Sequence, residues 1–375
     1  MAVLLSAIRD AGYLVHFAGV GMEQEERATL LPKVDRWVKN FDHRFSRSVR
    51  STGLGQSLSR IVATLRPRTR DEAAPASEEA QSLDRLMDAH WLGQMRTIQA
   101  RERYVRVLVS YVFHSAFLEA FGQDCLKVLD THDIFGGRKE RLQAEGLTNN
   151  WFSTTVDEER HGLLRADRII AIQDVEQRYF DQLLGGQREI RTVGHMQPAR
   201  FVDLEVGSRN RIGYFASDNT LNLEGFVWFQ EYCWPRIVAT CPEARLVVGG
   251  RVCRLISAPA QGVELLGEVA DPMAFHAKSL FSINPMPGGT GLKIKTVEAL
   301  AAGRPVIAFE AGAAGLGALV GRGLTVVTST EDFAQTCLRL LQDPVGTIAT
   351  GRSLPVRMEE LNATWLDQLR HTLEP

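Results

Sequence analysis

The sequence predicts an α/β fold made of two doubly wound, Rossmann-like domains that face a cleft. Short apolar runs rich in β-branched residues alternate with helical patterns over most of the 375 residues, as in parallel sheets wrapped by helices. A polar stretch near residue 200, MQPARFVDLEVGSRN, separates two such series. In the second series a glycine-rich loop stands between a strand and a helix, where folds of this class bind ligands.

The first series predicts five strands, and these runs are YLVHFAG (Tyr13 to Gly19), VRVLVSY (Val105 to Tyr111), LKVLDTH (Leu126 to His132), RIIAIQ (Arg168 to Gln173) and IRTVGH (Ile190 to His195). Residues 33–70 between the first two runs carry ten basic residues against two acidic ones. This basic segment has aromatic residues interleaved, so it fits an anionic membrane surface. A solvated basic helix pair explains it equally well. Residues 69–89 then turn acidic and predict an exposed loop that leads into a helix.

The second series predicts six strands, and these runs are RIGYFAS (Arg211 to Ser217), ARLVVGG (Ala244 to Gly250), VELLG (Val263 to Gly267), LFSINP (Leu280 to Pro285), RPVIAF (Arg304 to Phe309) and LTVV (Leu324 to Val327). Leucine and tryptophan residues then recur four apart at 361, 365, 369 and 373, on one face of a terminal helix. We therefore expect an N-terminal domain over residues 1–200 and a C-terminal domain over 201–355. Residues 356–375 should form a helix that packs back on the N-terminal domain.

Composition narrows the function classes. With 45% hydrophobic and 23% charged residues the chain is globular, and its net charge of −2 argues against nucleic acid as a partner. Five scattered cysteines without metal-ligand spacing indicate reduced core residues in a cytoplasmic protein. No apolar run approaches the roughly 18 to 20 residues of a membrane span. We expect a cytoplasmic protein, at most peripheral at the inner face of a membrane.

The sharpest functional signal is the stretch NPMPGGTGLKIKTVEALAAGRPVIAF, from Asn284 to Phe309. Its loop, which includes Gly289, Thr290 and Gly291, cannot continue a strand, and its glycines permit positive φ and close approach of a ligand. The following helix should bury one apolar face and stop near Gly303, and that face is Ile294, Val297, Leu300 and Ala301. A helix N-terminus aimed into the cleft fits a phosphate.

Three charged residues of this helix predict how a nucleoside diphosphate would be held. Lys293 and Lys295 put positive charge in the first turn, where the helix dipole disfavours it unless an anion binds. The Glu298 carboxylate suits the two hydroxyls of a ribose. A solvated helix face with an ordinary ion pair is the plain alternative. A phosphate-binding P-loop is excluded, because no Gly-Lys pair precedes a Ser or Thr at the required spacing.

The same stretch carries a family resemblance. Together with RIGYFASDNTLNLEGFVWFQEYCWPRI, ARLVVGG and VELLGEVADP, it resembles the donor-binding half of family 4 glycosyltransferases (glycosyl transferases group 1), which have the GT-B fold. The similarity covers most of residues 211–341. VLDTHDIFGGR and TTVDEERHGLLRADRIIAIQDVEQRYF are similar, more loosely, to the acceptor domain. The resemblance implies retaining transfer of a sugar from a nucleotide-sugar donor, with Glu298 as the ribose-binding glutamate.

The sequence departs from this family at two places. Thr290 stands where many members have a first glutamate near the donor sugar, so that contact is absent or supplied otherwise. After the strand RIGYFAS, many members carry an Arg and a Lys for the pyrophosphate, whereas this chain has DNTLNLEGF, and Lys293 and Lys295 are candidate replacements. Within that loop, Ser217 and Asn222 lie beside the same crevice. We expect Asn222 first of all to cap the helix that starts at Leu223.

In the first domain, His132 and Asp133 end a strand where a ligand-facing group would lie. The resemblance implies that His132 contacts the donor sugar, which makes His132 and Asp133 the candidate catalytic residues, and that Arg138 supports His132 or the acceptor. A structural histidine and a capping aspartate are the alternatives. Glu158 and Glu159 precede a predicted helix, where the helix dipole favours acidic side chains.

These features predict a glycosyltransferase that needs neither a metal nor a cofactor. The donor is a nucleotide-sugar, the acceptor a glycan or lipid-linked saccharide of surface polysaccharide synthesis. Two alternatives stay open: an inactive nucleotide-sugar-binding relative or scaffold, and an epimerase of similar fold. The first arises because the chain enters its first strand one strand later than this fold normally does, so the first domain is expected to lack its first strand or to begin upstream of Met1.

Overall fold

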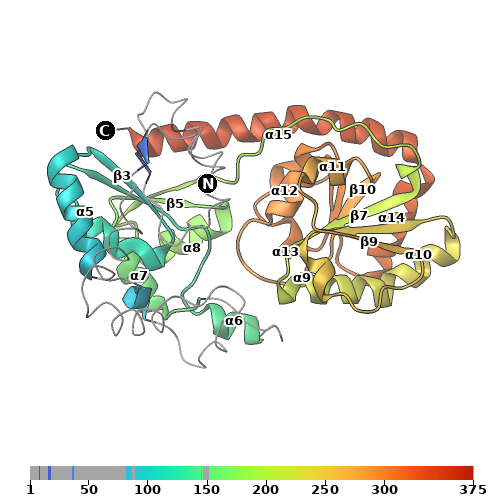
Figure 1. The fold of residues 1–375 in the computed structure, drawn as a ribbon, viewed down its shortest axis with the longest axis horizontal. Helices are drawn as coiled ribbons and strands as arrows, with labels where there is room; N and C mark the ends of the chain where they lie inside the picture. The colour runs from blue at the N-terminus through green and yellow to red at the C-terminus, as the bar shows by residue number, and fades with distance from the viewer. Residues whose placement is uncertain are drawn as a thin grey trace, which may run out of the picture. The chain divides into compact units, whose positions relative to one another are not determined.

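The computed structural model describes residues 82–86, 89–144, 146 and 152–374, together with residue 8 and the pairs 16–17 and 36–37 (Figure 1). The chain divides into two compact units. One comprises residues 1–79 and 87–103, the other residues 80–86 and 104–375. The larger unit contains the four-stranded and the six-stranded parallel sheets, which correspond to the two series of predicted strands.

The smaller unit holds two short parallel strands, β1 (His16–Phe17) and β2 (Arg36–Trp37), and helix α5 (Ala89–Glu102). Strand β1 lies inside the strand predicted for residues 13–19, whereas β2 was not predicted. Apart from β2, the basic segment 33–70 lies outside the described residues, as does the acidic stretch up to residue 81.

The first sheet of the larger unit has four parallel strands in the order β3-β4-β5-β6. They are β3 (Arg106–Ser110), β4 (Leu126–Asp130), β5 (Arg168–Ala171) and β6 (Glu189–Thr192). All four predicted strands are confirmed. Val128, Leu129 and Ile169 have no exposed surface, as expected of apolar runs in a sheet covered on both faces. Helix η3 (Leu83–Leu86) precedes β3, and the connections between the strands contain η4 (Val112–Ala120), α6 (Arg138–Ala144), α7 (Val156–Leu164) and α8 (Asp174–Leu184).

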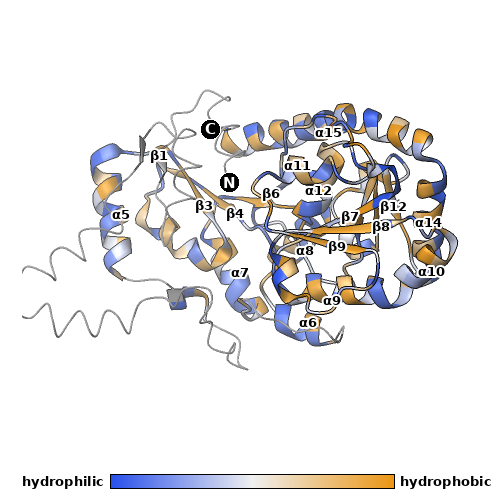
Figure 2. Cartoon of the chain, turned by 45° about the vertical axis from the view of Figure 1, so that its right-hand side comes forward, coloured by the Kyte–Doolittle hydropathy of each residue, from blue (hydrophilic) through white to orange (hydrophobic). Residues whose placement is uncertain are grey.

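The second sheet has six parallel strands in the order β12-β11-β10-β7-β8-β9. Their bounds are β7 (Arg211–Phe215), β8 (Arg245–Gly249), β9 (Val263–Gly267), β10 (Phe281–Asn284), β11 (Val306–Ala308) and β12 (Leu324–Val326). All six predicted strands are confirmed, and Figure 2 shows β7, β8 and β9 mainly in the apolar colour. The strand order reverses between β7 and β10, so their carboxyl ends open the crevice where this fold binds ligands.

Helices flank this sheet, and they are η5 (Ser208–Asn210), α9 (Thr220–Trp228), the π turn η6 (Phe229–Cys233), α10 (Trp234–Thr240), η7 (Arg251–Leu255), α11 (Pro272–His276), α12 (Ile294–Ala301), α13 (Glu310–Ala313), η8 (Gly317–Leu319) and α14 (Thr330–Gln342). Fully buried Trp234, Phe229 and Phe333 form the centre of the core on one face of the sheet. Phe226 of α9 belongs to the same core, which fixes this helix with its N-terminus at the crevice.

The terminal helix is longer than the sequence indicated. Helix α15 runs from Pro344 to Leu373 and carries Pro355 inside it, so the expected boundary at residue 355 falls within a continuous helix (Figure 1). Its first part contacts α12 and α14, and its last part contacts β4, β5 and β6. Trp365 is 4% exposed and packs on Gly194, where a Cβ would lie 2.3 Å from the indole. This single helix therefore joins both sheets.

Candidate functional site

The glycine loop follows β10 at the switch point of the second sheet and leads directly into α12. Gly289 and Gly291 have φ of 96° and 79°, as the sequence predicted for this turn. Val297 and Leu300 anchor α12 with no exposed surface, but Ile294 is 48% exposed. The prediction that Ile294 shares the buried face is wrong, because this residue begins the helix at the loop, beyond the core that its later turns cover.

Glu298 has a half-buried carboxylate to which no described residue donates a hydrogen bond. Burial raises its pKa from the ordinary 4.5 to about 7. Polar groups inside proteins are rarely left without partners, and exceptions call for an explanation such as a missing ligand. The carboxylate is therefore available to accept hydrogen bonds from a ligand.

The Lys293 side chain folds back over the glycine loop. Its Nζ donates to the carbonyl oxygens of Gly289, Thr290 and Gly291 at 3.1, 2.7 and 2.8 Å, and the residue is 8% exposed. An ammonium group has three donors, and these three carbonyls match them. Lys293 therefore binds the loop together, a role that the sequence analysis did not anticipate. Its contact with a diphosphate stays a prediction.

The Lys295 ammonium lies at the start of α9. Nζ donates to Asn222 Oδ1 at 2.6 Å and lies 5.2 Å from the centre of the Tyr214 ring. Burial, and then the nearby charge of Lys293, lower the pKa of Lys295 to about 7. Because burial disfavours the charged ammonium group of Lys295, a bound anion would stabilise it.

Asn222 is not the N-cap that the sequence analysis expected. Helix α9 begins at Thr220, and Asn219 caps it, because Asn219 Oδ1 accepts from Asn222 N at 2.9 Å. Asn222 instead lies buried in the first turn, where its Nδ2 donates to Ser217 O and Ser217 Oγ at 3.0 and 3.1 Å. The amide thus links the exposed Ser217 to Lys295.

His132 follows β4 in a strained backbone conformation, with φ of 61°. Its Nε2 lies 3.0 Å from Asp130 Oδ2, and its ring centre lies 4.4 Å from that of Tyr111, which follows β3 and also has positive φ. Positive φ is uncommon outside glycine, and residues held in it cluster at functional sites. The half-buried imidazole is therefore oriented by two neighbours at the carboxyl edge of the first sheet.

Asp133 and Arg138 form a close ion pair. Asp133 Oδ1 also accepts from Ile134 N at 2.9 Å, so this carboxylate is fixed at the strand end and caps no helix. The sequence analysis left open whether Arg138 supports His132 or the acceptor. In the structure its guanidinium binds Asp133.

Glu158 and Glu159 both lie in the first turn of α7, which Thr155 caps. Glu159 does more than favour the helix dipole. It has no exposed surface, and its Oε1 accepts from Phe135 N at 2.6 Å. Burial raises its pKa to about 7. Glu159 thus secures the chain that follows Asp133.

Glu176 brings the two sets of predicted residues together, although the sequence analysis missed it. Its Oε1 accepts a hydrogen bond from Gly291 N at 3.0 Å. Asp133 borders the same glycine, since a Cβ on Gly291 would lie 3.4 Å from the Asp133 carboxyl carbon. The only signal in the sequence was position, because Gln173 ends the strand predicted for residues 168–173 and Glu176 comes three residues later.

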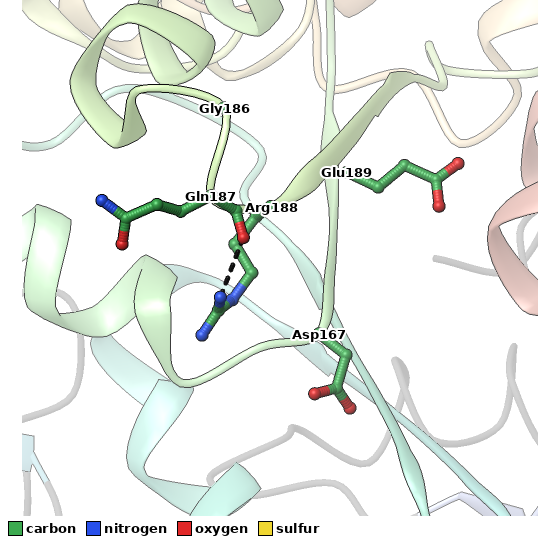
Figure 3. A pocket seen from close by; sticks show the side chains of 5 residues that line it. All are labelled: Asp167, Gly186, Gln187, Arg188 and Glu189. Atoms are coloured by element: carbon green, nitrogen blue, oxygen red, sulfur yellow. Dashed lines mark hydrogen bonds between the residues drawn. The ribbon is translucent and has the colours of Figure 1, made fainter.

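An open hollow lies elsewhere, at the amino ends of β5 and β6. Asp167, Gly186, Gln187, Arg188 and Glu189 line it (Figure 3). Arg188 donates to the carbonyl oxygens of Ala166 and Leu164 at 2.6 and 2.8 Å, which ties the turn to α7. These contacts are structural, and ligands of this fold bind at the opposite, carboxyl ends of the strands.

Comparison with known proteins identifies a similar family and structures with a similar fold. The family model described as "Glycosyl transferases group 1" matches residues 209–343. This region is similar to that family. The match spans β7 to α14 and includes the glycine loop, α12 and Glu298. No curated protein matches significantly.

Solved structures of glycosyltransferases share the fold at low sequence identity. TarM of S. aureus, solved as a mutant with fondaparinux, alpha-GlcNAc-glycerol and UDP, is 12% identical with a TM-score of 0.57, over 76% of this chain and 59% of TarM. Anabaena Alr3699/HepE, solved with UDP, is 16% identical with a TM-score of 0.55, over 76% and 82%. Sucrose-phosphate synthase of Thermosynechococcus elongatus is 17% identical with a TM-score of 0.56, over 76% and 77%. The chain has the GT-B fold and matches about three fifths of the length of TarM.

Two kinds of feature are absent from the described residues. None of the helices there is both long and apolar enough to cross a membrane. In the same part of the chain, no three His, Cys, Asp or Glu side chains gather as a metal site would require.

Proposed function

We propose that this protein is a glycosyltransferase that takes its sugar from a nucleotide-sugar donor. The observation that carries the proposal is the half-buried carboxylate of Glu298 on α12, to which no described residue donates a hydrogen bond. It lies within the matched family region and directly behind the glycine loop at the switch point of the second sheet. Glycine loops that lead into helices bind phosphate through free N–H groups and the helix dipole.

The diphosphate of the donor would lie at the N-terminus of α12. Lys295 supplies the positive charge, since its ammonium stands beside Asn222 at the start of α9. This is the place after β7 where the family resemblance led us to expect cations, so Lys295 would replace them from α12. The proposed contribution of Lys293 is indirect, because its ammonium holds the loop carbonyls. Ser217 and Thr290 would line the edge of this diphosphate site.

The ribose would bind Glu298, whose carboxylate accepts hydrogen bonds from both hydroxyl groups. The sugar would extend toward His132 and Asp133 on the first sheet. When the sugar leaves, negative charge develops on the diphosphate, and the helix N-terminus and Lys295 stabilise it where it forms. We propose retaining transfer that needs neither a metal nor a cofactor, because positioning and electrostatics supply the catalysis.

The proposed acceptor is a glycan or lipid-linked saccharide in surface polysaccharide synthesis. Arg138 would act on the acceptor side through its ion pair with Asp133. The TarM structure contains alpha-GlcNAc-glycerol and UDP, which supports this class of donor and acceptor. We propose cytoplasmic transfer with no nucleic acid partner. The basic segment 33–70 would bring the protein to the anionic inner face of the membrane.

Nucleotide binding and donor turnover test this function. UDP, GDP, dTDP and their sugar conjugates would be screened by thermal shift and then by release of free nucleoside diphosphate. We expect one nucleotide to raise the melting temperature and its sugar conjugate to be hydrolysed or transferred. Glu298→Ala should abolish both effects, whereas Glu360→Ala, an exposed control on α15, should not. Binding without turnover would indicate the inactive relative, and no binding at all would refute the proposal.

A further inference from the structure

Glu176 belongs to α8, on the side of the first sheet, but its carboxylate reaches the glycine loop of the second. Gly291 N donates to Oε1 at 3.0 Å, and Gln173 Nε2 donates to the same oxygen at 3.1 Å. The residue has no exposed surface. Glu176 therefore fixes the orientation of the Gly291 peptide at the loop where the donor diphosphate is proposed to bind.

The other carboxylate oxygen, Oε2, is buried and has no hydrogen-bond partner among the described residues. Two charged groups from the packed elements face this carboxyl group: Asp133 from the end of β4 and Lys293 from the start of α12. Asp133 is already paired with Arg138. Two neighbouring buried carboxyl groups do not both ionise readily. Glu176 is the one that accepts from neutral amides only, so it is the one that holds the proton.

The energetics agree with this assignment. Burial, and then the charge of Asp133, raise the pKa of Glu176 to about 8. Oε1 already accepts two hydrogen bonds, so the proton belongs on Oε2. A buried O–H group with no acceptor loses its hydrogen bond to water and gains none in return. An oxygen atom of a bound ligand would restore that hydrogen bond.

We propose that Glu176 is a further residue of the donor site: Oε1 holds the glycine loop through Gly291 N, and Oε2 donates a hydrogen bond to an oxygen of the bound nucleoside diphosphate. This inference rests on the proposed function. Because Oε2 has no exposed surface, the loop must shift when the nucleotide enters. Gly289 and Gly291 have positive φ, and the turn that they form can change its backbone conformation because glycine has no Cβ. An ionised Glu176 beside Asp133 would instead repel the diphosphate.

Calorimetric titration of UDP, GDP and dTDP into wild type and three variants tests the inference. Glu176→Gln keeps both an acceptor and a donor at every pH, Glu176→Ala removes both, and Asp174→Asn removes an exposed acid from the same helix turn as the control. At about pH 6.5 we expect Glu176→Gln to bind within about threefold of wild type and Glu176→Ala to bind about ten- to a hundredfold more weakly. Asp174→Asn should match wild type.

At about pH 9 the wild type should bind about tenfold more weakly than Glu176→Gln, since only the wild type has lost its proton. The titration of Lys295 affects both proteins and cancels in this ratio. A ratio that stays constant between the two pH values would overturn the inference. So would Glu176→Ala binding as tightly as wild type or more tightly, since the carboxylate would then be idle or compete with the phosphate.

The free energy of unfolding without nucleotide gives an independent readout. The pKa of Glu176 is higher in the folded protein than in the unfolded chain. Its protonated form therefore stabilises the fold fully below about pH 4.5, and this stabilisation is lost as the pH rises through about 8. Glu176→Gln should therefore gain stability over wild type across that window. A constant difference would refute the buried neutral acid. Wild type that binds no nucleotide would overturn the proposed function and the ligand contact together, whereas binding unchanged in every variant would overturn the inference alone.

Discussion

Replacing Glu298 by Gln should make the protein more stable above neutral pH while weakening its binding of nucleotide. The carboxylate is half-buried and has no hydrogen-bond donor in the described part of the chain, so its ionised form is unfavourable in the folded protein without ligand. Gln keeps the shape but not the charge. Stability would rise because the residue is kept for binding, which is a known trade-off at functional sites.

The expected size follows from the pKa of Glu298, which rises from 4.5 to about 7 on folding. A raised folded pKa means that the stability of the protonated form is complete below about 4.5 and lost as pH rises through about 7. The full difference corresponds to about 3 kcal/mol at most. Glu298→Gln should therefore exceed wild type by about 1 kcal/mol at about pH 5.5 and by about 3 kcal/mol at about pH 8.5.

Urea unfolding at the two pH values measures this gap, and calorimetry with the nucleotide that the wild type binds measures the affinity. Glu360→Gln, an exposed control on α15, should show no gap that grows with pH. If Glu298→Gln were less stable than wild type at about pH 8.5, its carboxylate would have a stabilising partner. The ribose assignment would then lose its physical basis.

Three further substitutions test other parts of the structure. Lys295→Met should weaken nucleotide binding about tenfold or more at about pH 6, where Lys295 is charged. The loss should be smaller at about pH 8.5, because the pKa of Lys295 is about 7. Equal losses of affinity by calorimetry at both pH values would contradict this. His132→Gly should leave the free energy of unfolding within about 1 kcal/mol of wild type, because glycine adopts positive φ without strain but adds conformational entropy to the unfolded chain. The same substitution should abolish donor turnover. Full turnover would exclude His132 from the site. Trp365→Ala should cost about 3 to 5 kcal/mol in urea unfolding, because its indole packs on Gly194; a loss below about 1 kcal/mol would show that α15 is not held there.

The strands of both sheets were predictable because each is a short apolar run bounded by turn residues. The start of α15 was not, because Pro355 reads as a break although the helix continues through it. The cap of α9 was assigned to the wrong asparagine, since Asn219 and Asn222 both precede the apolar pattern, and only the fold shows which one reaches a free N–H group.

The candidate site was predictable only where neighbours in sequence form it. The glycine loop, Lys295 and Glu298 lie close together along the chain, so their pattern was visible. Glu176 contacts Gly291 across 115 positions, and no spacing rule connects them. Even within the loop, sequence could not say where the lysine side chains turn, because that depends on which carbonyl or amide oxygen lies within reach.

A crystal structure of the protein with the nucleoside diphosphate that it binds tests the central claim most directly. The account predicts phosphate oxygens within hydrogen-bond distance of N–H groups in the glycine loop and the first turn of α12, with the ribose hydroxyls on the Glu298 carboxylate. A nucleotide bound elsewhere, or one whose ribose turns away from Glu298, would contradict it.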